Sequence, residues 1–340
     1  MRRFFIAGIL FALTPLAEAR MRPLPHRGWT TPLCTSIDGP PGLRFVAEPG
    51  LVRKSPDETT AEGVGAIAAG PGSNIVYAYF ENGIYESRDA GCSWKLRAQT
   101  PPASLDDFEW AILPANDRIY VHSNERLLRL TGDVLEIFPL LGPYERMFDM
   151  VVDPSNSLHL RGISENAKVF DSIDGGASWQ MIGQASARGG FRAMEVSPKN
   201  LDRLYGADYE HLFRSDDGGR TWTTLDLEYL VSLIESSPVD ENVVWIRAAD
   251  VAQQIVRLYG SIDGGRSFAL SIPETGELRF QRLAAHAREA NVLAAGALLG
   301  PVIVTMDGGI TTMREIRIRS IAWSPAGTLY YGVHNYATSW

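Results

Sequence analysis

The side chains in this sequence that are best placed to do chemistry are acidic residues on short apolar segments. They are Glu109, Asp149, Glu195 and Glu235. Each stands next to an apolar residue, so in a β-strand each carboxylate points to the face opposite the apolar one. Two facing carboxylates can hydrolyse a glycosidic bond, and several can bind a cation. Acids that simply line a water-filled channel are the alternative, and we favour it.

The other reactive residue types do not form a recognisable site. The five histidines beyond the first segment fall one per stretch of chain, without the H-E-x-x-H or similar spacing of metal ligands. They are His122, His159, His211, His286 and His334. The sequence also lacks G-x-S-x-G, a P-loop and a dinucleotide fingerprint. We therefore expect no cofactor and no bound metal.

The elements that would position the acids are marked by a repeated octad. Its copies are Ser87 to Trp94, Ser172 to Trp179, Ser215 to Trp222, Ser261 to Phe268 and, in a weaker form, Thr305 to Thr312. The aspartates at its third position are Asp89, Asp174, Asp217, Asp263 and Asp307, in steps of 85, 43, 46 and 44 residues. The first step spans two repeats, and Leu130 to Asp133 occupies the place of the missing copy. A period of this length indicates a repeat architecture.

The composition of the octad suits a structural turn. The Asp carboxylate can accept backbone N–H bonds inside a tight turn, and the glycines can adopt positive φ. The aromatic residue at the eighth position fills the gap beside the hairpin. These aromatic residues are Trp94, Trp179, Trp222 and Phe268. We expect the octad to hold a hairpin together and not to catalyse.

The octads resemble the Asp-box, or BNR, repeat S-x-D-x-G-x-[ST]-W of sialidases, sortilin-type receptors, some glycoside hydrolases and photosystem assembly factors. The resemblance implies a β-propeller. A sialidase-like site would also need clustered arginines, a Tyr–Glu nucleophile pair and an acid/base Asp. The candidate arginines Arg44, Arg192, Arg247 and Arg282 are scattered over different units. The resemblance therefore extends to the scaffold and not to the active site.

The strand pattern predicts the fold class: an all-β, seven-bladed β-propeller of four-stranded antiparallel blades with Asp-box hairpins. Inner strands are expected to begin near Ala66, Glu109, Asp149, Ala193, Leu233, Leu283 and Ser320. Their core-facing residues should be Ile67, Trp110, Met150, Met194, Ile234 and Ile321. Units of about 40 to 45 residues leave room for four short strands, and no stretch has a helical period.

The seventh unit, from Ser320 to Trp340, is too short for four strands. We expect the N-terminal segment, through Leu43 to Ala47 or the stretch around Cys34, to supply the missing outer strands and close the ring, which would leave no sheet edge bare. Cys34 and Cys92 are the only cysteines, and in an oxidising compartment the pair predicts a disulfide. This gives an N-terminal segment at 20–42, tethered by the disulfide, and a propeller at 43–340.

The first nineteen residues predict export. Arg2 and Arg3 precede an apolar run from Phe4 to Leu13, and Ala17 to Ala19 form an A-x-A cleavage site. The mature protein would lie in the periplasm or outside the cell. No later stretch is apolar enough to span a membrane, and a net charge of -8 argues against a nucleic-acid partner.

Taken together, these features predict an exported, monomeric, non-catalytic propeller that binds a protein or a glycan through loops. The expected contact loops, on the face opposite the octads, are Tyr79 to Asn82, Asp208 to His211 and Asp250 to Gln253. The alternative is a glycoside hydrolase of the sialidase-like scaffold that uses the four carboxylates. A periplasmic assembly factor ranks third, because this acidic chain has no basic docking patch.

Overall fold

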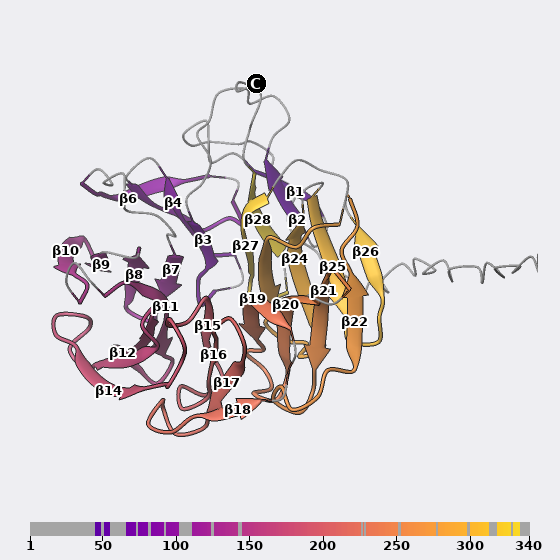
Figure 1. Cartoon of the computed structure of the whole chain (residues 1–340). Helices are drawn as coiled ribbons and strands as arrows, with labels where there is room; N and C mark the ends of the chain where they lie inside the picture. The colour runs from indigo at the N-terminus through magenta and orange to yellow at the C-terminus, as the bar shows by residue number, and fades with distance from the viewer. Residues whose placement is uncertain are drawn as a thin grey trace, which may run out of the picture.

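The fold is that of a β-propeller, seen in a computed structural model that describes residues 45–48, 51–54 and 66–333. Gaps remain at 73, 81–82, 92, 102–110, 124–125, 142–144, 226, 228, 251–252, 277, 298–299, 313–317 and 328. Four-stranded sheets follow one another in chain order around a common centre (Figure 1). The predicted signal peptide, the tethered segment and both cysteines lie outside the described residues.

Six of the sheets are blades made of four consecutive antiparallel strands. Blade 1 contains β3 (Ala66–Ala69), β4 (Val76–Phe80), β5 (Gly83–Ser87) and β6 (Lys95–Gln99). Blade 2 contains β7 (Ala111–Pro114), β8 (Arg118–His122), β9 (Arg126–Thr131) and β10 (Val134–Pro139). Blade 3 contains β11 (Met147–Asp153), β12 (Asn156–Ser164), β13 (Lys168–Ser172) and β14 (Gln180–Gln184).

The next three blades repeat this arrangement. Blade 4 contains β15 (Ala193–Val196), β16 (Leu204–Ala207), β17 (Leu212–Ser215) and β18 (Thr223–Leu225). Blade 5 contains β19 (Leu230–Ser236), β20 (Val244–Asp250), β21 (Ile255–Ser261) and β22 (Leu270–Pro273). Blade 6 contains β23 (Arg282–Ala285), β24 (Val292–Ala297), β25 (Gly300–Thr305) and β26 (Ile310–Thr312).

A further four-stranded sheet combines the two ends of the described chain. It runs β1 (Phe45–Glu48), β2 (Leu51–Lys54), β28 (Leu329–Val333), β27 (Ile318–Trp323). In this composite sheet β2 pairs with β28 in parallel, so the prediction of antiparallel strands throughout is wrong here. The physical reason is that β2 comes from the far end of the chain and is not tied to β28 by a hairpin, which would force antiparallel pairing. Strand β27 also contacts β3 of blade 1 and β23 of blade 6. That the N-terminal strands thereby close a seven-bladed ring stays a prediction.

The hydrophobic core lies between neighbouring blades. Bulky side chains from facing sheets form each cluster, as where Tyr205 of blade 4 packs with Val244 and Ile246 of blade 5. Tyr205 and Trp245 are fully buried, and the predicted core positions Ile67, Met150 and Ile234 are at most 7% exposed. Because each sheet buries both faces against its neighbours, a strand can be buried at every position, as β16 and β17 are.

Candidate functional site

Three of the four predicted carboxylates lie on the inner strands of successive blades. Asp149 is on β11, Glu195 on β15 and Glu235 on β19, whereas Glu109 lies outside the described residues. The inner strands of blades 3, 4 and 5 contact each other in sequence, and their carboxylates are close enough to perturb each other's titration. We call Asp149, Glu195 and Glu235 the inner carboxylates.

Each inner carboxylate accepts a hydrogen bond from the inner strand of the next blade. The Val196 N–H donates to Asp149 Oδ2 at 2.5 Å, and the Ala285 N–H donates to Glu235 Oε1 at 2.8 Å. Glu195 Oε1 accepts from both the N–H and the hydroxyl of Ser236, at 2.9 and 2.7 Å. An innermost strand has no strand on its central side, so its N–H groups need such acceptors. The inner carboxylates therefore join blade 3 to 4, 4 to 5 and 5 to 6.

Burial changes the acidity of these groups. It raises the pKa of Asp149 to about 6, against the opposing effect of the Val196 hydrogen bond. Burial also raises the pKa of Glu235 to about 8, with the charge of Asp149 adding to the effect. The pKa of Glu195 is raised well above its ordinary value by burial and by the charges of Asp149 and Glu235. At neutral pH Glu235 therefore keeps its proton, which a general acid requires, whereas Asp149 is largely ionised.

A cation site is not formed by these groups. Among the described residues no three His, Cys, Asp or Glu side chains are arranged to hold a metal ion. The described histidines serve other contacts: His122 is buried, and His286 Nδ1 accepts the N–H groups of Arg288 and Glu289. His159 binds Asp153 Oδ2 through Nδ1 at 3.0 Å, and His211 lies on an exposed turn. His334 lies outside the described residues.

The octad aspartates lie away from the inner carboxylates, in the turns between the third and fourth strands of their blades. In the copy at Asp217, the carboxylate accepts the Ser215 hydroxyl at 2.9 Å and the Thr221 N–H and hydroxyl at 2.8 and 2.6 Å. Asp89, Asp174 and Asp263 accept the same three bonds from their own octads. Asp307 accepts the Thr305 hydroxyl and the Gly309 N–H.

The remaining octad positions complete the turn. Trp94 and Trp222 donate their indole N–H to Gly91 and Gly219 of their own octads, at 3.0 and 2.9 Å. Trp179 packs in the cluster between blades 2 and 3, and Phe268 contacts Tyr259 edge-on. Gly219 has a φ of +85°, and a Cβ there would lie 2.4 Å from Val169 of blade 3.

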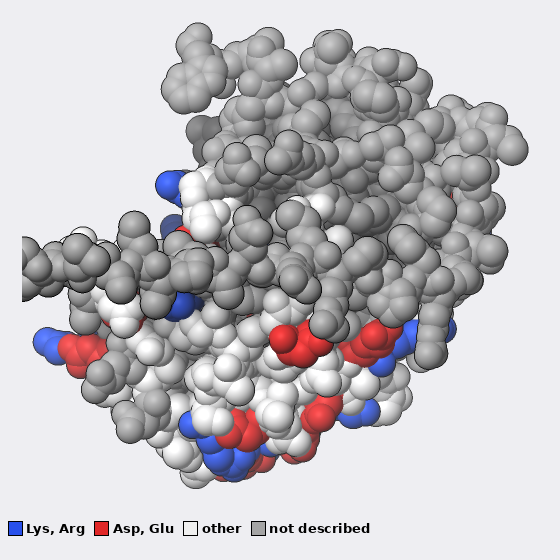
Figure 2. Space-filling model, turned by 90° about the vertical axis from the view of Figure 1, so that its right-hand side faces the viewer, with Lys and Arg blue, Asp and Glu red and all other residues white. Residues whose placement is uncertain are grey.

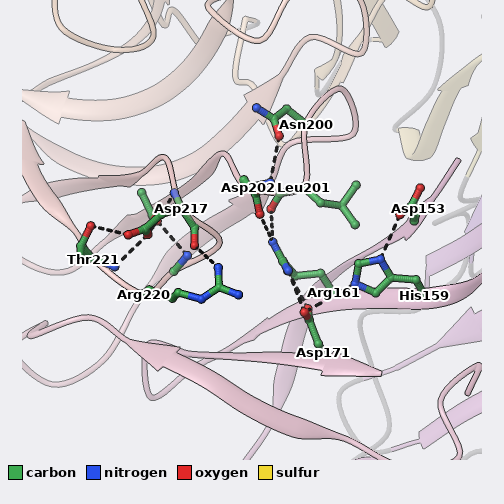
Figure 3. Close-up of polar contacts among 12 residues, drawn as sticks. Asp153, His159, Arg161, Asp171, Asn200, Leu201, Asp202, Asp217, Arg220 and Thr221 are labelled. Atoms are coloured by element: carbon green, nitrogen blue, oxygen red, sulfur yellow. Dashed lines mark hydrogen bonds and ion pairs between the residues drawn. The ribbon is translucent and has the colours of Figure 1, made fainter. Parts of the chain in front are cut away.

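Sequence reasoning missed a set of arginines that bridge blades at the octad side. Arg161 of blade 3 binds both oxygens of Asp171 at 2.6 and 2.7 Å, and reaches Asp202 of blade 4 at 2.8 Å (Figure 3). Arg129 and Arg214 bind octad carbonyl groups of the next blade, those of Gly175 at 2.9 Å and Gly264 at 3.0 Å. No short motif contains both partners, which are some 40 to 50 positions apart in the chain.

The arginines proposed for a sialidase-like cluster have separate surroundings. Arg247 pairs with Glu274 at 2.7 Å, Arg282 is exposed at the start of β23, and Arg44 lies outside the described residues. The guanidinium of Arg192 lies over the ring of Tyr209, 4.5 Å from its centroid. Among the described arginines, no such cluster surrounds the inner carboxylates.

The predicted contact loops connect second to third strands, so they open on the face opposite the octads, because antiparallel strands reverse direction at each turn. The loop from Asp208 to His211 is fully described, while the other two are described in part, without 81–82 and 251–252. Asp208 accepts the N–H groups of Glu210 and His211, both at 2.7 Å. The side chain of Tyr209, which lies between Asp208 and Glu210 in the sequence, is 63% exposed.

Charges of both signs are interspersed on the described part of the side shown in Figure 2. None of the described residues forms a helix long and apolar enough to cross a bilayer.

Comparison with known proteins supports the fold and leaves the activity open. No family model matches the chain. It is 25% identical over 290 residues to the dispase autolysis-inducing protein of Streptomyces mobaraensis, which covers 64% of this chain and 76% of that protein.

Solved structures similar to this chain are β-propeller neighbours of different function. YCF48 bound to D1 peptide aligns with a TM-score of 0.55 at 14% identity, over 74% of this chain and 79% of that one. YCF48 from Cyanidioschyzon merolae aligns with a TM-score of 0.57 at 13% identity, over 82% and 97%. The GH74 enzyme of Niastella koreensis aligns with a TM-score of 0.59 at 15% identity, over 82% of this chain and 52% of that enzyme. At these identities the likeness extends to the fold alone.

Proposed function

We propose that the protein is an exported, non-catalytic β-propeller that binds a protein partner through the loops opposite the octads. The observation that carries this proposal is the engagement of the inner carboxylates. Each accepts an N–H group of the next blade, so the acids best placed for hydrolysis are used to join blades. The loops on the opposite face, in contrast, present an exposed aromatic ring and charged side chains.

The similar proteins support a protein partner more than a glycan. One YCF48 structure contains a bound peptide, and the Streptomyces mobaraensis protein is named for its effect on another protein, dispase. Propellers commonly use one rim of loops for such contacts, because a rigid scaffold positions loops that are free to vary.

Three further features belong to this proposal. The segment ending at Ala19 is removed on export, Cys34 and Cys92 form a disulfide, and the composite sheet is the seventh blade of a closed ring. The octads are Asp-box repeats. Mass spectrometry of the exported protein, with and without reduction, tests the first two features.

The test of binding uses the purified protein against a phage-displayed random peptide library and a glycan array. We expect peptides that bind saturably and are displaced by the same peptide in solution. If the array yields a glycan ligand and the library yields none, the partner class is wrong. If neither yields a ligand, binding through these loops is wrong.

A second candidate is a glycoside hydrolase that uses the inner carboxylates, which the GH74 neighbour and the raised pKa values of Glu195 and Glu235 favour. A retaining or inverting enzyme needs one protonated and one ionised carboxyl group on either side of a bound sugar. The hydrogen bonds to Ser236 and Ala285 oppose this role, because they hold both glutamates against the neighbouring strand.

A further inference from the structure

On the face opposite the octads, Arg192 stacks on the exposed ring of Tyr209 and has no acidic partner among the described residues. Tyr209 lies in the turn between β16 and β17, and Arg192 immediately precedes β15. The Arg192 guanidinium stacks on the Tyr209 ring, 4.5 Å from its centroid, and both side chains are exposed. Among the described residues, the Arg192 side chain makes no hydrogen bond and no ion pair.

The backbone beneath this pair is held firmly. The Arg192 N–H donates to Ala207 O at 2.7 Å, which fixes the start of β15 against the end of β16. Asp208 is 2% exposed and accepts three backbone N–H groups, those of Glu210, His211 and, at 2.9 Å, Arg188. The Asp208 carboxylate therefore ties together the two loops that contain Arg192 and Tyr209. A ligand would meet a site that needs little rearrangement, which favours affinity.

The neighbouring charges point to an anionic ligand. Arg188 and Glu210 pair with each other at 2.8 Å, so their charges offset. The other carboxylate of the two loops, Asp208, is buried and makes no ion pair with Arg192. Arg192 is therefore the cation of the two loops that is left without an ion pair among the described residues. A guanidinium stacked on a ring still has its edge N–H groups free, and two of them match the two oxygens of a carboxylate.

We propose that Arg192, stacked on Tyr209, binds a carboxylate group of a peptide partner. This inference rests on the proposed function and names the chemistry of its site. Arg192 holds the carboxylate through two parallel N–H···O bonds, while the exposed part of the Tyr209 ring packs on the adjoining apolar atoms. The Arg188–Glu210 pair beside it offers a donor and an acceptor to the peptide backbone.

The test uses the whole protein and three labelled six-residue peptides of otherwise identical sequence. The first has two internal glutamates and an amidated C-terminus, the second has glutamines and a free C-terminal carboxylate, and the third has glutamines and an amidated C-terminus. Fluorescence anisotropy at low salt measures affinity, and the Nε–H resonance of Arg192 reports direct contact. Arg192 can bind a carboxylate from a side chain or from a C-terminus. The first two peptides distinguish these two sources.

We expect at least one carboxylate peptide to bind and to shift the Arg192 resonance, and the uncharged peptide to bind about tenfold or more weakly. Arg192→Gln should remove this preference, and Tyr209→Ala should weaken it. The matched control is Arg282→Gln, another exposed arginine at the start of an inner strand, which should bind as the unchanged protein does.

Equal affinity for all three peptides, or an unchanged preference in Arg192→Gln, would overturn the inference. If library peptides bind the protein but Arg192→Gln leaves their affinity unchanged, the proposed function stands and this site is wrong. If no peptide from the library or the designed set binds, the proposed function fails as well.

Discussion

At the scale of single residues, carboxylates in this protein fall into two groups with opposite acidity. Hydrogen bonds from the Ser178 hydroxyl and N–H lower the pKa of the octad residue Asp174 to about 2. Burial on an inner strand raises the pKa of Glu235 to about 8, although it too accepts a backbone N–H. Three donors on a partly exposed group outweigh desolvation, while one donor on a deeply buried group does not.

Replacing an octad aspartate should destabilise the fold. In Asp217→Ala the Thr221 N–H and the two hydroxyl groups lose their shared acceptor, which should lower the free energy of unfolding by about 1 to 3 kcal/mol. Urea denaturation measures the difference. The matched control is Asp133→Ala in the degenerate copy, where the side chain is 96% exposed. A loss as large in the control would show that the octad bonds are not responsible.

The inner carboxylates should make the protein less stable as the pH rises. In the unfolded chain a glutamate has a pKa of about 4.3, whereas burial raises the pKa of Glu235 to about 8 in the folded protein. Between these two pH values the folded protein therefore binds protons that the unfolded chain has released. The contribution of these protonated carboxyl groups to the free energy of unfolding is fully present in acid and is lost as the pH rises through 8. His122, whose pKa burial lowers to about 4, has the opposite effect in the acid range, so pH 6.5 to 8 is the informative window.

We expect the free energy of unfolding to fall by about 1 to 2 kcal/mol across that window, and by less in a Glu195→Gln, Glu235→Gln double variant. Urea denaturation at both pH values measures this. Glu210→Gln, at an exposed ion pair, should leave the fall unchanged. A double variant with the same pH dependence as the unchanged protein would contradict the role assigned to the inner carboxylates.

The sequence was sufficient to find these inner acids but not to explain them. Alternation along the strands placed Asp149, Glu195 and Glu235 together because a period of two is fixed by strand geometry. Their acceptance of N–H groups from the next blade depends on how neighbouring sheets are offset, which no local pattern encodes. The Tyr209–Arg192 stack was missed for the same reason, since its members come from separate loops.

At the scale of elements, the blades are joined on two sides. The inner carboxylates act near the centre, and the arginines of second and third strands act at the octads. Arg161 is 4% exposed and contacts Asp171 of its own blade and Asp202 of the next. Such buried, multiply bonded guanidinium groups fix the relative position of the sheets they join.

Removing the Arg161 charge should be costly. Arg161→Met keeps most of the aliphatic stem but leaves Asp171 with a poorly compensated charge, so unfolding should become easier by about 3 kcal/mol. Arg220→Met is the control, because Arg220 is exposed and, within the described part of the chain, its side chain hydrogen-bonds only to Asp217 O of its own octad turn. Thermal and urea denaturation of both variants test this, and equal losses would show that bridging between blades is not the cause.

At the scale of the whole molecule, the composite sheet joins residues 45–54 to the last described strands. The prediction that the N-terminal segment completes the final sheet came from counting residues, since 320–340 cannot supply four strands. The parallel pairing of β2 with β28 could not be foreseen, because the chain between them is the entire propeller. Sequence patterns specify hairpins well and pairings between distant segments poorly.

Two truncations test the importance of this sheet. A chain that begins at residue 43 keeps β1 and β2, while a chain that begins at 56 leaves the edge of β28 unpaired. We expect the shorter chain to melt several degrees lower and to self-associate, because an unpaired edge strand recruits other chains. Differential scanning calorimetry and size-exclusion chromatography compare them. Identical behaviour would mean that β1 and β2 do not support the fold.

We propose that the inner carboxylates join blades and do not hydrolyse glycosides. The most direct test of this proposal is turnover of a panel of fluorogenic glycosides, sialosides included, by the purified protein and by the Glu195→Gln, Glu235→Gln double variant. We expect no turnover above background from either protein. Turnover by the unchanged protein that disappears in the double variant would contradict it and identify a hydrolase.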